Sequence, residues 1–259
     1  MKDPTPIRLL IEICKLGFSG NITLIRGCPQ PFLSDSDTIT LLLSGYSFVR
    51  WGDGETAIVR GKDIYYQQAD EKLSCKLKRL AFHPPSRTII GLPWTVEKSL
   101  FSTKWNIRIF KIMFSTRVFW SSLFDLRKNQ LLLGRTEFWW NHASKITEIL
   151  TQISLRASAT VLIGPKRFLK FCPKKTHHIE IPERDAFSDY QSICLQIEKI
   201  IRSSSGLVAI LVAAGPTAKA IAADFAEKSQ VIDVGHGFNF AEGGFGSWSW
   251  STRNNRQNE

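Results

Sequence analysis

The alternation of two residue patterns constrains the fold of this chain more than any other sequence feature. From about residue 38 onward, short apolar segments alternate with segments of helical periodicity. We predict strands at 46–51, 87–92, 159–163, 178–181, 207–212 and 231–234, and helices near 55–61, 70–82, 137–153, 185–203 and 217–228. Strands that alternate with helices favour an α/β fold: a Rossmann-like, mostly parallel sheet with helices on both faces.

The same pattern predicts three parts of the chain. Residues 1–37 form an N-terminal lead-in with a short amphipathic helix near 6–16. Residues 38–242 form the α/β domain. Residues 243–259 are rich in Gly, Ser and Asn, and we expect a flexible tail there.

One segment within the predicted domain, 101–124, does not fit the alternation. Lys104, Arg108 and Lys111 fall on one face of a possible helix, with apolar and aromatic residues around them. Such a helix can lie on an anionic membrane surface. The alternative is a helix that packs in the core and exposes a basic stripe.

The net charge of +11 at pH 7 favours polyanionic partners: nucleic acid, anionic lipid or a phosphate-bearing substrate. No nucleic-acid-binding motif is visible, so we expect no nucleic-acid partner. The five cysteines include no CxxC pair, which fits a reducing cytoplasm. No uncharged apolar run of about 18 residues occurs, so we expect a cytoplasmic protein with peripheral contact to the inner membrane at most.

The end of the first predicted strand carries the clearest candidate site. Asp53 and Glu55 are two residues apart and would point to the same side of an extended backbone, where they could supply oxygen ligands to Mg²⁺ or Mn²⁺. Gly52 and Gly54 would let a phosphate approach the backbone, and Arg50 adds a cation. The alternative is a Gly-Asp-Gly turn whose aspartate caps the next helix.

Three other strand ends carry polar candidates. Lys166 could bind an anionic group, or could be an exposed lysine on a turn. Gly215 and Thr217 open a helix and could bind phosphate, or could form an ordinary strand-to-helix turn. His236, with Asp233 behind it, is placed for proton transfer, although a lone histidine is more often structural. No Walker A or GxGxxG motif appears, so a nucleotide site would be of another kind.

Five stretches carry a resemblance to a known family: 48–70 (FVRWGDGETAIVRGKDIYYQQAD), 161–166 (VLIGPK), 179–190 (IEIPERDAFSDY), 212–225 (VAAGPTAKAIAADF) and 231–236 (VIDVGH). In order and spacing they resemble the bacterial GT-D glycosyltransferases, over about residues 45–236. The run after His236 departs from the family pattern and leaves Glu242 as its only acid.

The resemblance implies transfer of a sugar from a nucleotide-diphosphate donor, a UDP-sugar in the first instance, to a saccharide acceptor. Asp53 and Glu55 would serve Mn²⁺ (or Mg²⁺) and the donor diphosphate, and Arg50 carries over with them. The acceptor would belong to bacterial surface polysaccharide or glycoprotein synthesis and could be lipid-linked.

Three other readings of the sequence remain. A basic nucleic-acid-binding protein would bind DNA or RNA in a salt-sensitive manner. A Rossmann-like methyltransferase would bind S-adenosylmethionine without metal. A non-catalytic homologue would act as the partner of another transferase.

Overall fold

The computed structural model of the chain describes residues 28, 30–97, 119–120, 123–124, 126 and 130–243. The predicted helix near 6–16, the basic segment with Lys104, Arg108 and Lys111, and the tail beyond residue 243 lie outside the described residues. The chain divides into two compact units, one made of Leu33–Leu92 with Leu132–Glu259 and the other of Met1–Phe32 with Pro93–Leu131. No helix among the described residues is long and apolar enough to cross a membrane.

The larger unit is built on a seven-stranded sheet with the order β3-β2-β1-β7-β6-β4-β5. The strands are β1 (Ser47–Arg50), β2 (Thr88–Leu92), β3 (Leu132–Arg135), β4 (Ala159–Ile163), β5 (His177–Ile179), β6 (Val208–Val212) and β7 (Gln230–Asp233). Every pairing between these strands is parallel, which confirms the predicted sheet. The central strands are buried along their whole length, as expected for a sheet covered on both faces.

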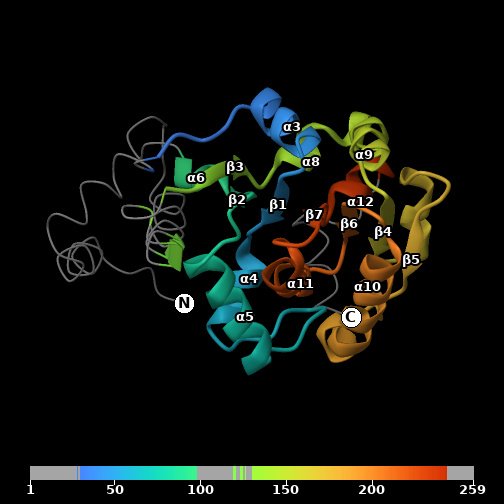
Figure 1. Cartoon of the computed structure of the whole chain (residues 1–259). Helices are drawn as coiled ribbons and strands as arrows, with labels where there is room; N and C mark the ends of the chain where they lie inside the picture. The colour runs from blue at the N-terminus through green and yellow to red at the C-terminus, as the bar shows by residue number, and fades with distance from the viewer. Residues whose placement is uncertain are drawn as a thin grey trace, which may run out of the picture. The chain divides into compact units, whose positions relative to one another are not determined.

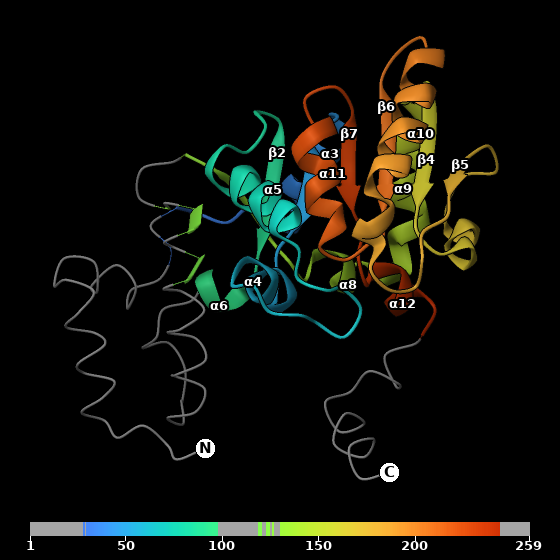
Figure 2. The same cartoon turned by 90° about the horizontal axis from the view of Figure 1, so that it is seen from below.

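Helices cover both faces of this sheet (Figures 1 and 2). On one face lie α3 (Asp35–Leu43) and α9 (Ile146–Leu155), and on the other lie α5 (Glu71–Phe82), α10 (Tyr190–Ser203) and α11 (Thr217–Phe225). Shorter helices are α4 (Asp53–Val59), α8 (Phe138–Asn141) and α12 (Gly237–Ala241), with 3₁₀ turns η1 (Ala143–Lys145), η2 (Lys166–Phe171) and η3 (Ala186–Asp189). The smaller unit contains α6 (Trp94–Glu97).

Two elements of the larger unit were not predicted. The strand β3 escaped prediction because Gly134 interrupts its apolar pattern; a Cβ at Gly134 would lie 3.0 Å from Cγ2 of Ile89 and 3.1 Å from Cε2 of Phe48, so the neighbouring side chains fill its place. The helix α3 begins at Asp35, within the segment predicted as the N-terminal lead-in. Ser34 is its N-cap and its hydroxyl accepts from the backbone N–H of Asp37, so the Ser/Asp run starts a helix.

The predicted helix at 137–153 is divided rather than continuous. The chain leaves α8 at His142 and resumes through η1 into α9. The His142 ring lies 4.8 Å from the Phe138 ring, and its Nε2 lies 3.0 Å from Oδ2 of Asp35 on α3. This tertiary contact accompanies the break that the periodicity did not predict.

Aromatic packing beside β1 and β7 holds in place the carboxyl ends of these two central strands, where a site can form. Phe48 packs on Phe138 with ring centroids 5.5 Å apart, and the Trp139 indole N–H donates to the backbone oxygen of Asp233 at 3.1 Å. From β1 the chain runs outward through β2 to β3, and the later strands are added on the other side, beyond β7. Ligands of open parallel sheets bind beyond the carboxyl ends of the strands at such a change of direction.

Candidate active site

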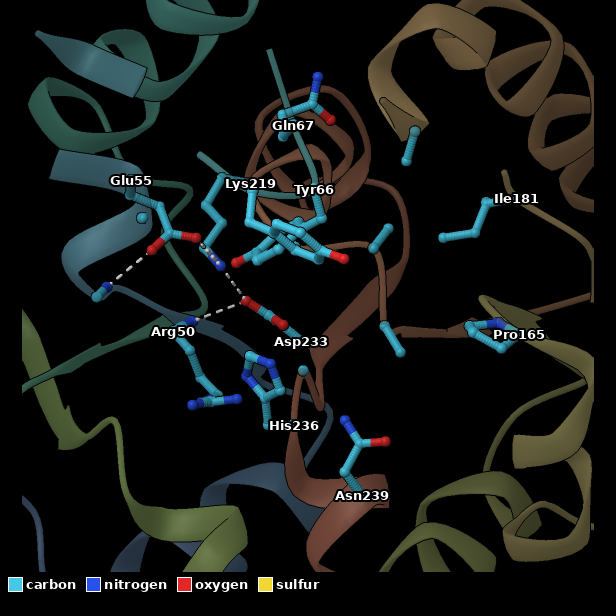
Figure 3. A pocket seen from close by; sticks show the side chains of 18 of the residues that line it. Arg50, Glu55, Tyr66, Gln67, Pro165, Ile181, Lys219, Asp233, His236 and Asn239 are labelled. Carbon is cyan, nitrogen blue, oxygen red and sulfur yellow. Dashed lines mark hydrogen bonds and ion pairs between the residues drawn. The ribbon is translucent and has the colours of Figure 1, made fainter. Parts of the chain in front are cut away.

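A pocket of about 450 Å³ lies at the carboxyl ends of the central strands (Figure 3). One end is charged and is lined by Arg50, Asp53, Glu55, Lys219, Asp233 and His236. The other end is largely apolar and is lined by Pro165, Phe168, Ile181, Pro182, Ala213 and Ala214. Figure 3 shows Pro165 and Ile181 across the pocket from Glu55 and Arg50. The cavity can therefore hold a ligand that is anionic at one end and weakly polar at the other.

Most of the predicted site residues meet in this pocket. Arg50, Gly52, Asp53, Gly54, Glu55, Gly215, Asp233 and His236 all line it. Lys166 does not line the pocket; the next residue, Arg167, does. Thr217 is fully buried, and its hydroxyl donates to Oε1 of Gln67 at 3.4 Å, so it does not present a hydroxyl to a phosphate.

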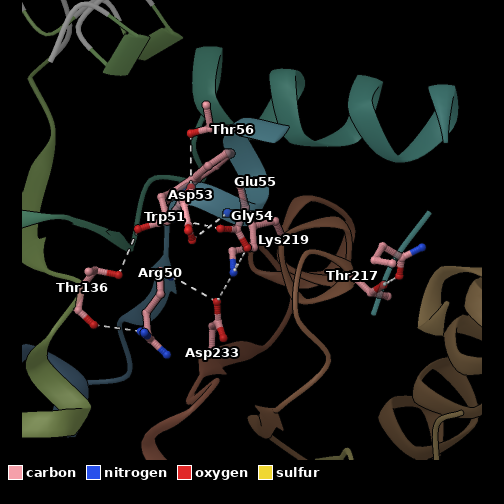
Figure 4. A network of polar contacts seen from close by, with 12 residues as sticks. Arg50, Trp51, Asp53, Gly54, Glu55, Thr56, Thr136, Thr217, Lys219 and Asp233 are labelled. Atoms are coloured by element: carbon pink, nitrogen blue, oxygen red, sulfur yellow. Dashed lines mark hydrogen bonds and ion pairs between the residues drawn. The ribbon is translucent and has the colours of Figure 1, made fainter. Parts of the chain in front are cut away.

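A buried lysine holds two carboxylates together at the charged end (Figure 4). The Lys219 ammonium lies 2.7 Å from Oε1 of Glu55 and 2.7 Å from Oδ2 of Asp233. The three side chains are 5%, 9% and 1% exposed. Burial alone would raise the pKa of Glu55 and lower the pKa of Lys219, but the Lys219 ammonium lowers the pKa of Glu55, and the carboxylates of Asp233 and Glu55 raise the pKa of Lys219. Glu55 and Lys219 are therefore both charged at neutral pH.

Glu55 also caps its own helix. Gly52 precedes α4 and has no side chain to accept from the first helical N–H groups, and the Glu55 carboxylate reaches back to the Gly52 N–H at 2.8 Å. One oxygen of Glu55 thus binds Gly52 and the other binds Lys219. The carboxylate is fixed at the floor of the pocket.

Asp53, in contrast, is exposed at the pocket. Its Oδ1 accepts from the N–H of the next residue, Gly54, at 3.0 Å. Asp53 and Glu55 were predicted to point the same way on an extended backbone, but α4 begins at Asp53. Residues two apart on a helix differ by about 200° in direction, so the two carboxylates have different surroundings. The alternative of an aspartate that caps α4 is also wrong, because the N-cap is Gly52.

Arg50 ties three segments together beside the pocket. Its Nε donates to the backbone oxygen of Thr136 at 2.8 Å and its Nη1 to that of Val234 at 3.1 Å, while its backbone N–H donates to Oδ2 of Asp233. Its guanidinium also lies 5.4 Å from the centre of the Trp140 ring. The side chain is 8% exposed, so its position is set before any ligand arrives.

Gly235 makes room for this guanidinium, which leads to a stability prediction. Gly235 has φ +50, and a Cβ there would lie 2.2 Å from Nη1 of Arg50. We expect Gly235→Ala to lower the free energy of unfolding by about 2–3 kcal/mol, because the alanine would strain the backbone at residue 235 and would also displace the Arg50 guanidinium. Urea unfolding measures it. Gly61→Ala is the matched control, since Gly61 has φ +71 with nothing within 4 Å of its Cβ, and an equal loss in both variants would contradict the role given to Arg50.

The loop between α4 and α5 closes over the pocket, and the sequence did not predict this. Tyr66 packs against two glycines: a Cβ at Gly215 would lie 2.7 Å from its ring, and one at Gly54 would lie 3.4 Å from its hydroxyl. These glycines therefore leave space for the side chain of Tyr66. Gln67 accepts from the backbone N–H of Phe187 at 3.3 Å, and the Tyr66 carbonyl accepts from the N–H of Asp185, which joins the loop to the far side of the pocket.

Two further features of the charged end affect its titration. Burial, and then the charge of Arg50, lowers the pKa of His236, so its imidazole is neutral at neutral pH. Burial and the neighbouring carboxylates of Glu55, Asp53 and Asp233 raise the pKa of Tyr66, so its hydroxyl stays protonated. A neutral imidazole at this position can accept a proton.

Sequence reasoning missed several lining residues, of which Lys219 matters most. Its signal was available: Lys219 lies among small and apolar residues of an Ala-rich helix, and Ala218, Ala220 and Ile221 are all buried around it. A lysine among buried neighbours usually has a charged partner. Tyr66, Gln67, Trp140, Arg167 and Asn239 also line the pocket, but no local pattern distinguished them.

The sheet and its pocket are typical of α/β enzymes that bind their ligands beyond the carboxyl ends of the strands. Residues 48–131 and 172–240, more than half of the chain, match the family model of the glycosyltransferase GT-D fold. The chain therefore belongs to this family of glycosyltransferases. The comparison with curated proteins finds no match.

Three solved structures are similar to the chain over most of its length. A selenomethionine-substituted structure of domain of unknown function 1792 is 19% identical, with a TM-score of 0.61, and covers 87% of this chain and 82% of its own. A structure described as the same domain with a distinct glycosyltransferase fold is 17% identical, with a TM-score of 0.59 and coverages of 92% and 84%. A glycosyltransferase from Streptococcus sanguinis is 20% identical, with a TM-score of 0.56 and coverages of 84% and 84%. At these identities the likeness shows the fold.

Proposed function

We propose that this glycosyltransferase moves a sugar from a nucleoside-diphosphate donor, first of all a UDP-sugar, to a hydroxyl of a saccharide acceptor. The observation that carries the proposal is the exposed carboxylate of Asp53 at the charged end of a pocket whose other end is apolar. The apolar end suits the flat face of a nucleobase, and the charged end suits a diphosphate and a sugar. Arg50 and Arg167 supply positive charge along the pocket.

A divalent cation, Mn²⁺ or Mg²⁺, forms part of the proposal, and Asp53 is the residue that fits it. Mg²⁺ is commonly held by one or two carboxylates together with substrate phosphates, and Asp53 offers one such carboxylate. Glu55 does not fit as a direct ligand in this arrangement, because its two oxygens bind Gly52 and Lys219. When bound, the ion would offset the negative charge that develops on the departing diphosphate.

His236 is proposed as the general base that takes the proton of the attacking hydroxyl. Asp233 would hold Lys219 and Arg50 in place rather than take up the proton, because it is 1% exposed and is bound to the Lys219 ammonium and to the Arg50 backbone N–H. Glu242 does not line the pocket, and its carboxylate lies 2.8 Å from the Lys170 ammonium. His236 is thus the better-placed proton acceptor of the three.

This role predicts a specific pH dependence. Since the pKa of His236 is lowered from its ordinary value of 6.5, the imidazole is neutral at and above pH 6.5 and becomes protonated only at lower pH. We expect kcat/KM to fall on the acid side, and His236→Gln to lower it by about 10²-fold and remove that fall. Donor turnover between about pH 5 and 8 measures both. An acid limb unchanged in His236→Gln would exclude the role.

The acceptor is proposed to be a saccharide of bacterial surface polysaccharide or glycoprotein synthesis. The net charge of +11 favours a lipid-linked acceptor presented at an anionic membrane, because such a surface attracts a strongly basic protein. The protein would then act at the inner face of the membrane while remaining peripheral to it.

The test of the proposed function is release of nucleoside diphosphate from a panel of UDP-, GDP-, CDP- and dTDP-sugars, with Mn²⁺ and with Mg²⁺. We expect one nucleotide class to be turned over, and turnover to stop when the ion is chelated. Turnover that EDTA does not affect would contradict the metal in the proposal. No release from any donor, with acceptor extracts present, would contradict the donor class.

A further inference from the structure

The Lys219 ammonium occupies the space between the two buried carboxylates of the pocket. Lys219 lies in the first turn of α11, whereas Glu55 follows β1 and Asp233 ends β7. The ammonium is 2.7 Å from an oxygen of each, and Figures 3 and 4 show it between them. The ion pair therefore joins three segments far apart in the sequence at the floor of the pocket.

The Lys219 ammonium occupies the position between Glu55 and Asp233 that a divalent cation bridging them would need. A divalent ion bound to Oε1 of Glu55 or to Oδ2 of Asp233 would stand at about 2.0–2.6 Å from that oxygen, in the space that the ammonium fills. Two cations at such separations repel strongly in a buried setting. To admit the ion, Lys219 would have to leave both partners, and its charge would be buried without compensation.

The formal charges at this end of the pocket also favour Asp53 over Glu55 and Asp233 as the residue that meets a divalent ion. The buried side chains of Glu55 and Asp233 have a formal charge of −2, and those of Lys219 and Arg50 have +2, so the four sum to zero. Lys219 pairs with both carboxylates, whereas the Arg50 guanidinium donates to backbone oxygens nearby. The negative charge that remains at this end of the pocket belongs to Asp53, which is exposed. The described residues hold no group of three or more His, Cys, Asp or Glu side chains that could enclose a metal. A single carboxylate binds such an ion weakly unless the substrate supplies further oxygens.

We infer that Lys219 is a positioning residue that serves as a fixed cation for Glu55 and Asp233, and that Asp53 is the carboxylate that meets the divalent ion, which therefore binds together with the donor diphosphate and not before it. This inference rests on the proposed donor class. It separates the two acids of the Asp-x-Glu sequence: Asp53 contacts the ion, and Glu55 holds Lys219 and the start of α4.

The test uses electron paramagnetic resonance to measure how tightly Mn²⁺ binds, once with Mn²⁺ alone and once with Mn²⁺ plus UDP. We expect the wild type to bind Mn²⁺ tightly only with UDP, and Asp53→Asn to weaken that binding by about 100-fold or more, as for a lost direct ligand. Glu55→Gln keeps one amide oxygen, which can accept from Lys219 or from the Gly52 N–H but not from both, and it should weaken the binding by only about tenfold, as for a residue that does not contact the ion. A loss in Glu55→Gln as large as that in Asp53→Asn would overturn the division between the two acids.

The Mn²⁺-alone arm tests Lys219 without any nucleotide. Lys219→Met leaves two buried carboxylates without a cation, so Mn²⁺ alone should bind about tenfold or more tightly than to the wild type and should raise the melting temperature of the variant. Lys219→Gln, whose amide still donates hydrogen bonds, is the second variant if Lys219→Met folds poorly. Binding no tighter than in the wild type in a folded variant would overturn the inference. If the proposed function were wrong, the wild type would bind no nucleoside diphosphate with Mn²⁺. The measurements with Mn²⁺ alone would still show whether Lys219 excludes the ion.

Discussion

Asp53→Asn is expected to slow the release of nucleoside diphosphate from the donor by about 10³-fold, which is about 4 kcal/mol of lost transition-state stabilisation. The amide keeps the size of the side chain and its oxygen can still accept from the Gly54 N–H, so α4 should be unaffected. What is lost is the negative charge that would hold the divalent ion against the donor diphosphate. Initial rates at saturating donor measure the effect.

The control for this substitution is another exposed acid of the same unit. Glu71→Gln removes a carboxylate from the first turn of α5, outside the pocket, and should leave the rate within about twofold. If Asp53→Asn retains wild-type turnover, or if both variants lose the same small amount, the pocket does not use Asp53 in transfer and the metal part of the proposal fails.

Lys219→Met is expected to have the largest effect on stability, a loss of about 3–5 kcal/mol in the free energy of unfolding. The change leaves Glu55 and Asp233 buried with no cation between them. Lys76→Met is the matched control: its ammonium lies 2.6 Å from Asp224, but the lysine side chain is 25% exposed. An ion pair of that kind contributes about 1 kcal/mol or less, so this variant should unfold near the wild type.

The pH range of this stabilisation follows from the signs of the pKa shifts. The pKa of Glu55 is lowered from 4.5, so its contribution is complete above that value and is lost as the pH falls through the native pKa. The pKa of Lys219 is raised from 10.5, so its contribution is complete below that value and is lost as the pH rises through the native pKa. In urea unfolding the cost of Lys219→Met should therefore be complete at about pH 8 and should shrink toward acid pH, where the buried carboxylates of the variant take up protons; no cost at pH 8 would contradict the ion pair.

Much of the sheet could be predicted from the sequence because local patterns encode it. The apolar runs at 159–163 and 207–212 gave strands within a residue of β4 and β6, since strands of a doubly covered sheet are apolar along their length. The strand β3 was not predicted because Gly134 interrupts its apolar pattern. The glycine is needed there because the Ile89 side chain packs too closely for a Cβ. The Ser/Asp run that starts α3 has the composition of a turn, so the helix can be recognised only from the apolar residues that follow.

The candidate site was predicted in its position but not in its internal arrangement. Strand ends gave Arg50, Asp53 and His236 as pocket residues, because the carboxyl ends of parallel strands converge. The pairing of Glu55 with Lys219 could not be predicted, since the two are far apart in the sequence and Glu55 was taken to lie on an extended segment. The packing of Tyr66 on Gly215 depends likewise on how a loop folds back over a distant helix.

Calorimetric titration of UDP into the wild type and into Asp53→Asn, each with and without Mn²⁺, tests the central claim most directly. The claim is that the pocket binds a nucleoside diphosphate through a divalent ion at Asp53. It predicts binding to the wild type with Mn²⁺, and binding at least about 100-fold weaker when either Mn²⁺ or the Asp53 carboxylate is removed. Equal binding in all four titrations, or no binding of UDP, GDP, CDP or dTDP under any of them, would contradict it.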